Sequence, residues 1–383
     1  MTTDGGKIKK CFSCTALIFI ALCCFAALIK KPDIAIGYMK SGLRLCAETV
    51  IPSLFPFMVL SGLFVELGLS EIFAFIFSKP MKLLFGTGGA GAAAPIMGAL
   101  CGFPVGALTA HRLYAKGRIS SREAARLIAF SNNPSSAFLI SAVGTALWSC
   151  PKFGIVLYII QLLSAAIIGI AMRFIAPPYE CDTVSEGEKM KGFSVRTLTK
   201  VISESAISML NICALILFFA SLVGALTSFL EGFGIIQSTK TLIYGFFEMT
   251  GAVREASKIL PIESGMIITA LICGWSGLSV HFQVISICFD DGISFAPYFA
   301  AKLSQGILSA LFMLFYISFV DKTLPSLCMP ALASGVALSS KSTTLSILSN
   351  AVLIIGLIYS LLGKYPRCTS HTFLQGRRDN RRP

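Results

Sequence analysis

Four hydrogen-bonding side chains lie close together inside the apolar stretch LICGWSGLSVHFQVISI, residues 271–287. Polar side chains at bilayer depth are costly and usually face a cavity or one another. Two glycines, Gly274 and Gly277, add the backbone freedom that a helix break needs. For the histidine alone, a hydrogen bond between two helices is the alternative. We predict a broken or re-entrant helical element that places four groups beside a solute path: Ser276, Ser279, His281 and Gln283.

A second polar cluster interrupts apolar sequence in SNNPSSAF, residues 131–138. Its asparagines and serines surround Pro134 and supply turn chemistry and oxygens that cap a backbone. Each apolar flank is too short to cross a bilayer, which needs roughly 20 helical residues. The pattern favours the tip of a re-entrant hairpin, and the alternative is a short loop outside the membrane. The candidate solute-binding residues here are Asn132, Asn133, Ser135 and Ser136.

A third break is predicted in GTGGAGAAAPIMGALCGFPVGALTAHR, residues 86–112. A proline within a helix frees a carbonyl that hydrocarbon cannot satisfy, so Pro104 should face protein or water. The glycines have a second interpretation, because Gly98, Gly102 and Gly106 are spaced for close packing between helices.

Two glutamates, Glu48 and Glu204, stand at the heads of long apolar stretches. Either could bind a coupling proton or cation, although a carboxylate near a helix start is also ordinary capping. In HRLYAKGRISSREAARLIAF, Ser120 or Ser121 is expected to cap a charged interfacial helix that has Glu123 in its first turn.

The letters GWSG also match the GxSG pattern of intramembrane serine proteases. Such an enzyme needs a histidine on a facing helix, whereas His281 lies five residues beyond Ser276 in the same segment. The sequence contains no phosphate-binding loop, nucleotide-binding fingerprint or HExxH zinc motif. We therefore expect no enzymatic activity, no cofactor and no metal. The 13 cysteines lie mostly in apolar stretches, which favours packing residues over disulfides.

The composition indicates that membrane helices must position these groups. Hydrophobic residues make up 55% of the chain and charged residues 13%, and the mean hydropathy is +0.78, which is outside the soluble globular range. The expected fold is an all-α polytopic membrane protein with about 8–10 membrane segments. Uncharged stretches of roughly bilayer length are residues 11–29, 49–65, 83–110, 127–151, 153–172, 205–230, 264–289, 303–320 and 342–363.

The two halves of the chain are weakly alike. ETVIPSLFPFMVLSGLF aligns with ESAISMLNICALILFFA, and GALCGFPVGA aligns with TALICGWSGL. This pattern predicts two inverted repeats, as in many secondary transporters. If every stretch crosses, the helices after Glu48 and Glu204 run parallel. If residues 127–151 and 264–289 are re-entrant, those helices run antiparallel. Lys and Arg counts do not separate these topologies.

The predicted organisation has five parts. They are an uncleaved N-terminal transmembrane helix (residues 1–37), a first repeat (38–177), a polar loop (178–200), a second repeat (201–363) and a basic cytoplasmic tail (364–383).

Three motifs, GFPVGA, SNNPSSAFLISAVG and GWSGLSVHFQV, carry a family resemblance. With these motifs in this order, the chain resembles the YlbJ-type sporulation integral membrane proteins of endospore-forming Firmicutes from about residue 38 to 365. These proteins are a group of the nucleoside-recognition, or Gate-domain, membrane proteins. The resemblance implies a place in the outer forespore membrane, movement of dipicolinic acid toward the spore, and a need in cortex formation. It also implies likeness to concentrative nucleoside transporters, which have inverted repeats with re-entrant hairpins.

The chemistry leaves the solute open. Dipicolinate, an anionic aromatic molecule, could stack on Trp275 or Phe282, but a nucleoside would use much the same groups. A membrane scaffold that transports nothing is the alternative of another class. The expected partners are a small solute and the lipid bilayer, with a homo-oligomer possible. The net charge of +13 needs no nucleic acid, because Lys and Arg accumulate in cytoplasmic loops.

Overall fold

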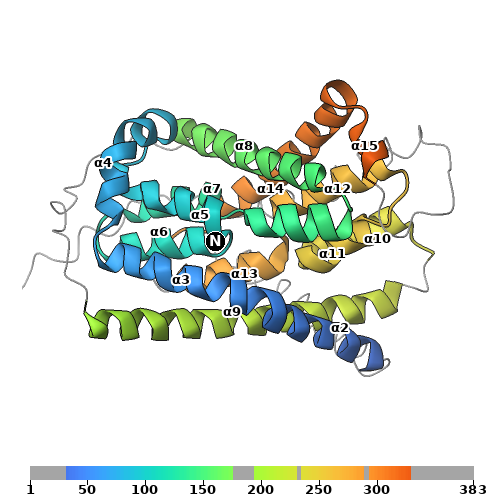
Figure 1. The fold of residues 1–383 in the computed structure, drawn as a ribbon, viewed down its shortest axis with the longest axis horizontal. Helices are drawn as coiled ribbons and strands as arrows, with labels where there is room; N and C mark the ends of the chain where they lie inside the picture. Colours follow the sequence, from blue (N-terminus) through green and yellow to red (C-terminus); the bar gives the residue numbers. More distant parts are fainter. Residues whose placement is uncertain (1–31, 176–193, 231–233, 289–292, 329–383) are drawn as a thin grey trace, which may run out of the picture. The chain divides into compact units, whose positions relative to one another are not determined.

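Every regular element that the structure describes is a helix, as expected for an all-α protein (Figure 1). The computed structural model describes residues 32–175, 194–230, 234–288 and 293–328, all within the first of two units of the chain, residues 1–340. Residues 1–31 of the predicted N-terminal helix, most of the polar loop, the stretch 342–363 and the basic tail lie outside the described residues.

The first half contains eleven described helical elements. They are α2 (Pro32–Leu45), η1 (Cys46–Val50), α3 (Ile51–Glu66), α4 (Ser70–Pro80), η2 (Met81–Phe85), η3 (Gly89–Ala92), α5 (Ala93–Cys101), α6 (Val105–Ala115), α7 (Ser121–Ser131), η4 (Ala137–Leu147) and α8 (Pro151–Ile175).

The second half begins with the longest described helix. Its described elements are α9 (Val195–Leu230), α10 (Gln237–Phe247), α11 (Met249–Ala256), α12 (Ile262–Trp275), α13 (Gly277–Cys288), α14 (Ala296–Phe315), η7 (Tyr316–Val320) and α15 (Leu324–Leu327).

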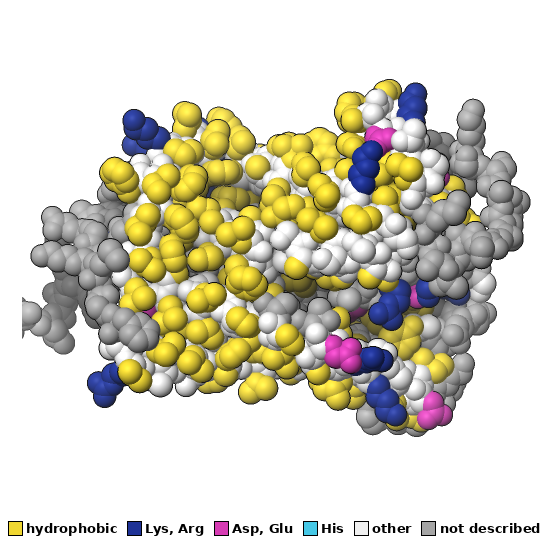
Figure 2. All heavy atoms as spheres, in the orientation of Figure 1, with side chains coloured by type: hydrophobic (Ala, Val, Ile, Leu, Met, Phe, Trp, Pro, Cys, Tyr) yellow, Lys and Arg dark blue, Asp and Glu magenta, His cyan; other side chains and the backbone are white. Residues whose placement is uncertain are grey.

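The helices have the length and composition of a polytopic membrane protein. Within the described residues, four are long and apolar enough to cross a bilayer, or five if one bent pair is counted as a span. Figure 2 shows hydrophobic side chains spread over the visible face, with Lys, Arg, Asp and Glu toward its two ends. The four spans are Pro151–Phe174, Val195–Thr227, Ile262–Cys288 and Ala296–Val320.

Helices α2 and α3 run antiparallel to α9 (Figure 1). Gly42 lies against Ala220, whereas Gly62, further along the chain, lies against Val201. The helices that follow Glu48 and Glu204 are therefore antiparallel, as the topology with one re-entrant segment in each half requires.

The re-entrant geometry in the first half belongs to α5 and α6. These helices have 9 and 11 residues, too few to cross a bilayer. Gly98 of α5 lies against Gly106 of α6, so the chain folds back on itself. Gly102, with φ of 82°, and Pro104, the N-cap of α6, form the tip.

Helices α10 and α11 form the corresponding hairpin in the second half. The Gln237 amide, at the start of α10, donates to the Glu255 carboxylate near the end of α11 at 3.1 Å. Glu248 lies at the tip between the two helices.

The two polar clusters lie instead at breaks within continuous crossings. Phe130 of α7 packs near Gly169 of α8, and Leu139 of η4 packs near Gly154, so α7 and η4 lie end to end along α8. The hairpin tip favoured for residues 131–138 is therefore wrong, whereas for residues 271–287 the broken form of the two predicted is the one observed. Asparagine, serine and proline mark where a helix ends, but packing against a neighbouring long helix decides whether the chain continues or returns.

The second broken crossing follows α14 in the same manner. Gly306 packs against Trp275 at the end of α12, and Tyr298 lies 5.1 Å from the His281 ring of α13. The break is at Ser276, which has a left-handed φ of 73°.

The order of elements therefore recurs: a helix, a hairpin, a broken helix and a long helix. It reads α3, α5–α6, α7–η4 and α8 in the first half, and α9, α10–α11, α12–α13 and α14 in the second. Corresponding elements also pack together, as α3 with α9 and α8 with α14 do. The sequence pairing of GALCGFPVGA with TALICGWSGL was wrong, because the first is a hairpin tip and the second a break in a crossing.

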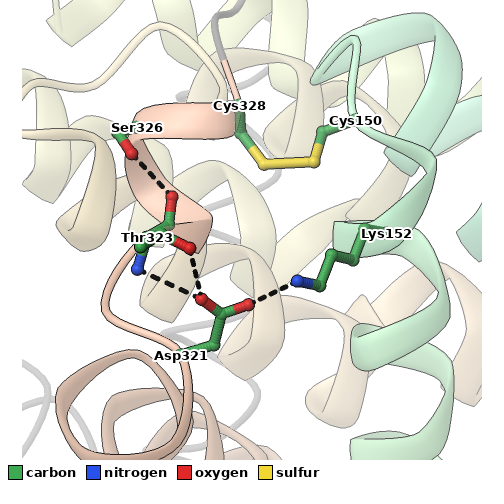
Figure 3. Close-up of a disulfide and its surroundings, with 6 residues drawn as sticks. All are labelled: Cys150, Lys152, Asp321, Thr323, Ser326 and Cys328. Atoms are coloured by element: carbon green, nitrogen blue, oxygen red, sulfur yellow. Dashed lines mark hydrogen bonds and ion pairs between the residues drawn. A yellow bond between two sulfur atoms is a disulfide. The ribbon is translucent and has the colours of Figure 1, made fainter.

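A disulfide joins Cys150, before α8, to Cys328, after α15 (Figure 3). Nearby, Lys152 pairs with Asp321 at 2.7 Å, and Asp321 also accepts from the Thr323 hydroxyl at 2.7 Å. The hydrogen bond from Lys152, with those from Thr323, lowers the pKa of Asp321 to about 2. Packing was favoured over disulfides for the cysteines, and this pair is an exception. The two cysteines are 178 residues apart, so their spacing gave no sign of the pairing.

Candidate functional site

A cavity of about 450 Å³ lies where both hairpin tips and both breaks meet. Phe103 comes from the first tip and Glu248 from the second. Ser135 comes from the first break, while Ser279 and Gln283 come from α13, just after the second. The remaining wall is mainly apolar, including residues of α3 and α9. Concave, mostly apolar cavities with a few placed polar groups are typical ligand sites.

Three of the predicted solute-binding residues line this cavity: Ser135, Ser279 and Gln283. Glu248 was not among the predicted site residues. Its carboxylate accepts hydrogen bonds from the backbone N–H groups of Thr250 and Gly251, each at 2.7 Å. Its position at a hairpin tip between two short helices gave no periodic signal. Among the described lining residues Glu248 is the only charged one.

Asn132 and Asn133 are buried behind the cavity, where they tie the first break to α14. The Lys302 ammonium donates to the backbone carbonyl of Asn132 at 2.9 Å and to the Gln305 side-chain carbonyl at 2.8 Å. The Gln305 amide donates to the Asn133 side chain at 2.8 Å, and the Asn132 amide donates to the Tyr298 hydroxyl at 3.1 Å. These asparagines therefore shape the wall rather than form it.

The network continues into α8. The Ser309 hydroxyl lies 3.3 Å from the Gln161 side-chain carbonyl and 3.1 Å from the Ser164 hydroxyl. Lys302 stands just before the uncharged stretch 303–320, Gln305 lies within it, and neither was among the predicted site residues. The signal that could have found them is a lysine and a glutamine three residues apart at the start of an apolar stretch.

His281 is fully buried among aromatic rings. Its ring centroid lies 4.2 Å from that of Trp275, 5.1 Å from that of Tyr298 and 4.8 Å from that of Phe299. Within the described residues, neither ring nitrogen makes a hydrogen bond of ordinary geometry. The histidine thus stands behind Ser279 and Gln283 rather than in the cavity wall.

The remaining serines have local roles. The Ser276 hydroxyl donates to the Cys273 carbonyl at 3.2 Å, within its own helical turn. Ser136 is half-buried at the start of η4 and is not part of the cavity lining.

The predicted helix breakers divide into two kinds. Pro104 lies at the hairpin tip, Pro134 within the first break, and Gly277, with φ of 77°, at the second. Gly274 is instead inside α12, where it allows close approach to Gly306, so its assignment as a break is corrected.

The aromatic surface of the cavity differs from the expectation. Trp275 is buried and stacks on Phe246 with centroids 5.7 Å apart, and Phe282 lies on the exposed side of α13. Neither lines the cavity, whereas Phe103 and Phe138 do.

A second cavity, of about 790 Å³, carries the basic charge that the first lacks. Lys116 pairs with Glu66 at 3.0 Å, and Lys200 pairs with it at 3.4 Å. Burial raises the pKa of Glu66, but the hydrogen bond and charge of Lys116, helped by Lys200, outweigh it and hold the pKa below its usual value. The Arg112 guanidinium, also in the lining, donates to the Met58 carbonyl at 3.0 Å.

Neither predicted coupling glutamate is among the residues that line the central cavity. Glu48 is 61% exposed and pairs with Arg44 at 2.8 Å. Glu204 lines the basic cavity, is 49% exposed and lies 3.8 Å from Lys200. Within the described residues no group of three His, Cys, Asp or Glu side chains is placed to hold a metal ion.

An apolar cluster lies between the two cavities. Ile212 lines the first cavity and Leu108 lines the second, and both belong to this cluster. Its other buried members are Met58, Cys101, Val105 and Met209.

One curated protein gives a sequence match. It is the sporulation integral membrane protein YlbJ of Bacillus subtilis (strain 168), 28% identical over 322 residues, which are 76% of this chain and 79% of that protein. No protein-family model matches the chain, and no solved structure matches it.

Proposed function

We propose that this YlbJ-like protein is a sporulation membrane transporter that moves dipicolinic acid across the outer forespore membrane. Spore maturation and cortex formation would depend on this transport. The observation that carries transport is the cavity enclosed by two hairpin tips and two helix breaks. Broken helices that meet at mid-membrane are a common way to build a solute site.

The cavity suits a small planar solute. Its volume of about 450 Å³ falls within the usual range for ligand sites. Phe103 and Phe138 offer aromatic surface, and Ser135, Ser279 and Gln283 offer hydrogen bonds. The basic cavity on the other side of the apolar cluster would attract a dianion toward the path.

Movement of the solute requires the apolar cluster to open. Leu108 and Val105 belong to α6, so a shift of the first hairpin would part them from Met209 and Ile212 of α9. The hairpin helices are short, whereas the long helices pack against one another. We assign the moving part to the hairpins.

A neutral solute such as a nucleoside is the second candidate. The observation that favours it is the carboxylate of Glu248, since no Lys or Arg is found among the described residues that line the central cavity. Unlabelled nucleoside that outcompetes dipicolinate in vesicles containing the purified protein would select this candidate.

The test compares spores whose only copy of the protein carries Asn133→Ala or His281→Ala at normal protein level. We expect dipicolinate content to fall about tenfold in each, because each change removes packing or hydrogen bonds that set the cavity wall. Ser304→Ala, on the exposed side of α14, is the matched control.

Normal dipicolinate in both variants would reject this site. A scaffold role predicts that same result, together with loss of cortex when the whole protein is deleted.

A further inference from the structure

Lys302 is a fully buried lysine without an acidic partner in the described part of the chain. Its ammonium donates to the Asn132 carbonyl and to the Gln305 side-chain carbonyl, both neutral groups. None of the ion pairs among the described residues includes it. A charge at this depth is costly, and such residues usually mark a pathway for ions or protons.

The lysine lies where the two broken crossings meet. It comes from α14, which packs along α12 and against α7 and α8. The titratable groups near it are Cys273 of α12, His281 of α13 and Tyr298 of α14. The neighbouring polar groups of the first break and α8, Asn132 and Gln161, carry no charge.

Both polar walls of the central cavity connect to this lysine. On one side, the Asn132 carbonyl belongs to the break that leads to Ser135 in the wall. On the other, His281, which is close enough to Lys302 to interact with its charge, is two positions along the chain from both Ser279 and Gln283 of the cavity lining. A charge that enters the cavity therefore changes the free energy of protonating Lys302. Protonation in turn changes the hydrogen bonds that Lys302 makes to the first break.

We propose that Lys302 is the proton-binding site that couples solute movement to a proton gradient, an inference that rests on the proposed function. The amine lone pair takes up one proton from water on one side of the membrane and releases it to water on the other, and no other bond forms or breaks. An arriving dianion favours the ammonium, because it supplies the missing counter-charge. Movement of a dianion with one proton carries one net negative charge instead of two.

The test uses the purified full chain in lipid vesicles with labelled dipicolinate. Exchange without a pH gradient measures transport itself, and accumulation under an imposed pH gradient measures coupling. For Lys302→Gln we expect accumulation, relative to exchange in the same vesicles, to fall about tenfold, the size of a typical coupling between two sites. Lys322→Gln removes an exposed charge and is the matched control.

Three outcomes separate the inference from the function. Accumulation that persists in Lys302→Gln overturns the inference, as does a wild-type protein that exchanges dipicolinate with no response to the pH gradient. Absence of exchange in the wild type overturns the proposed function instead. If the glutamine variant does not fold, Lys302→Arg, which keeps a permanent charge, should exchange solute without accumulating it, and accumulation by this variant would reject the inference.

A solute-independent measurement then decides whether Lys302 binds and releases a proton. The melting temperatures of the wild type and Lys302→Gln are compared over a range of pH. The difference between them should change with pH if the lysine changes its protonation state. A difference that stays constant contradicts the assignment.

Discussion

Gln305 connects three segments that are far apart in the sequence. Its side-chain carbonyl accepts from Lys302, and its amide donates to Asn133 and contacts Gln161 of α8. A buried amide that satisfies both its donor and its acceptor stabilises one arrangement, because any other leaves a polar group without a partner. The first break, α8 and α14 are therefore held in one register by a single side chain.

The ion pairs of Glu66 should stabilise the folded protein in a way that is lost in acid. Its pKa in the folded protein is lowered mainly by Lys116, with help from Lys200, so the pairing stabilises the protein above the ordinary carboxyl range and is lost as pH falls through the folded pKa. We expect Glu66→Gln to lower the melting temperature at neutral pH and to flatten its acid limb. Glu255→Gln, at the opposite end of the fold, is the control. Parallel melting profiles for Glu66→Gln and the wild type would contradict the assignment.

The positions of helix ends were more predictable than the direction of the chain after them. The expected cap of α7 is confirmed, since Ser120 accepts from the Glu123 backbone at 3.3 Å and Glu123 reaches back to Ser120. The breaks near Pro104, Pro134 and Gly277 are also where the residue types indicated. Whether the chain then continues in the same direction or turns back depends on packing against α8 and α14. Local residue preferences do not predict that contact between distant segments.

The first hairpin depends on two glycines that face each other. A Cβ at Gly98 would lie 1.8 Å from the Ser131 carbonyl oxygen, which is backbone at the end of α7 and cannot move cheaply. We expect Gly98→Ala to destabilise the protein by about 1–3 kcal/mol, the usual range for overpacking. Thermal unfolding in detergent measures this. Gly37→Ala, with nothing within 4 Å of the added atom, should be neutral or slightly stabilising. Equal melting temperatures for the two variants would reject the hairpin packing.

Across the described molecule, the long crossings form a connected frame. Helices α8 and α14 pack together, share the hydrogen bonds of Ser309 in the interior, and are joined near one end by the Cys150–Cys328 disulfide and the Lys152–Asp321 pair. The hairpins α5–α6 and α10–α11 have no such covalent link among the described residues. Under the proposed function, this frame would hold the walls while the hairpins move.

We expect the disulfide to contribute strongly to the stability of the folded protein and to lie on one defined side of the membrane. Closing 178 residues removes chain entropy from the unfolded state, so replacing both cysteines by serine should cost up to about 5 kcal/mol. Thermal unfolding with and without reductant measures it. Disulfides persist on the oxidising side of a membrane. Because Cys150 is as buried as Cys101, a maleimide is added after the protein is denatured: Cys150 should react only after reduction, whereas Cys101, the control, should react with or without it. Labelling of Cys150 without reduction would contradict the link.

The apolar cluster around Met58 and Ile212 also has an electrical consequence. In the proposed transport cycle, water entering the two cavities would conduct the membrane potential inward, so most of the voltage would drop across this thin layer. Each elementary charge that crosses the full potential exchanges about 2.3 kcal/mol per 100 mV. A dianion passing between Leu108 and Ile212 would therefore meet nearly the whole transmembrane field within a few side chains. Substitutions that thicken or hydrate this layer should alter the voltage dependence of solute flux more than the affinity of the protein for the solute.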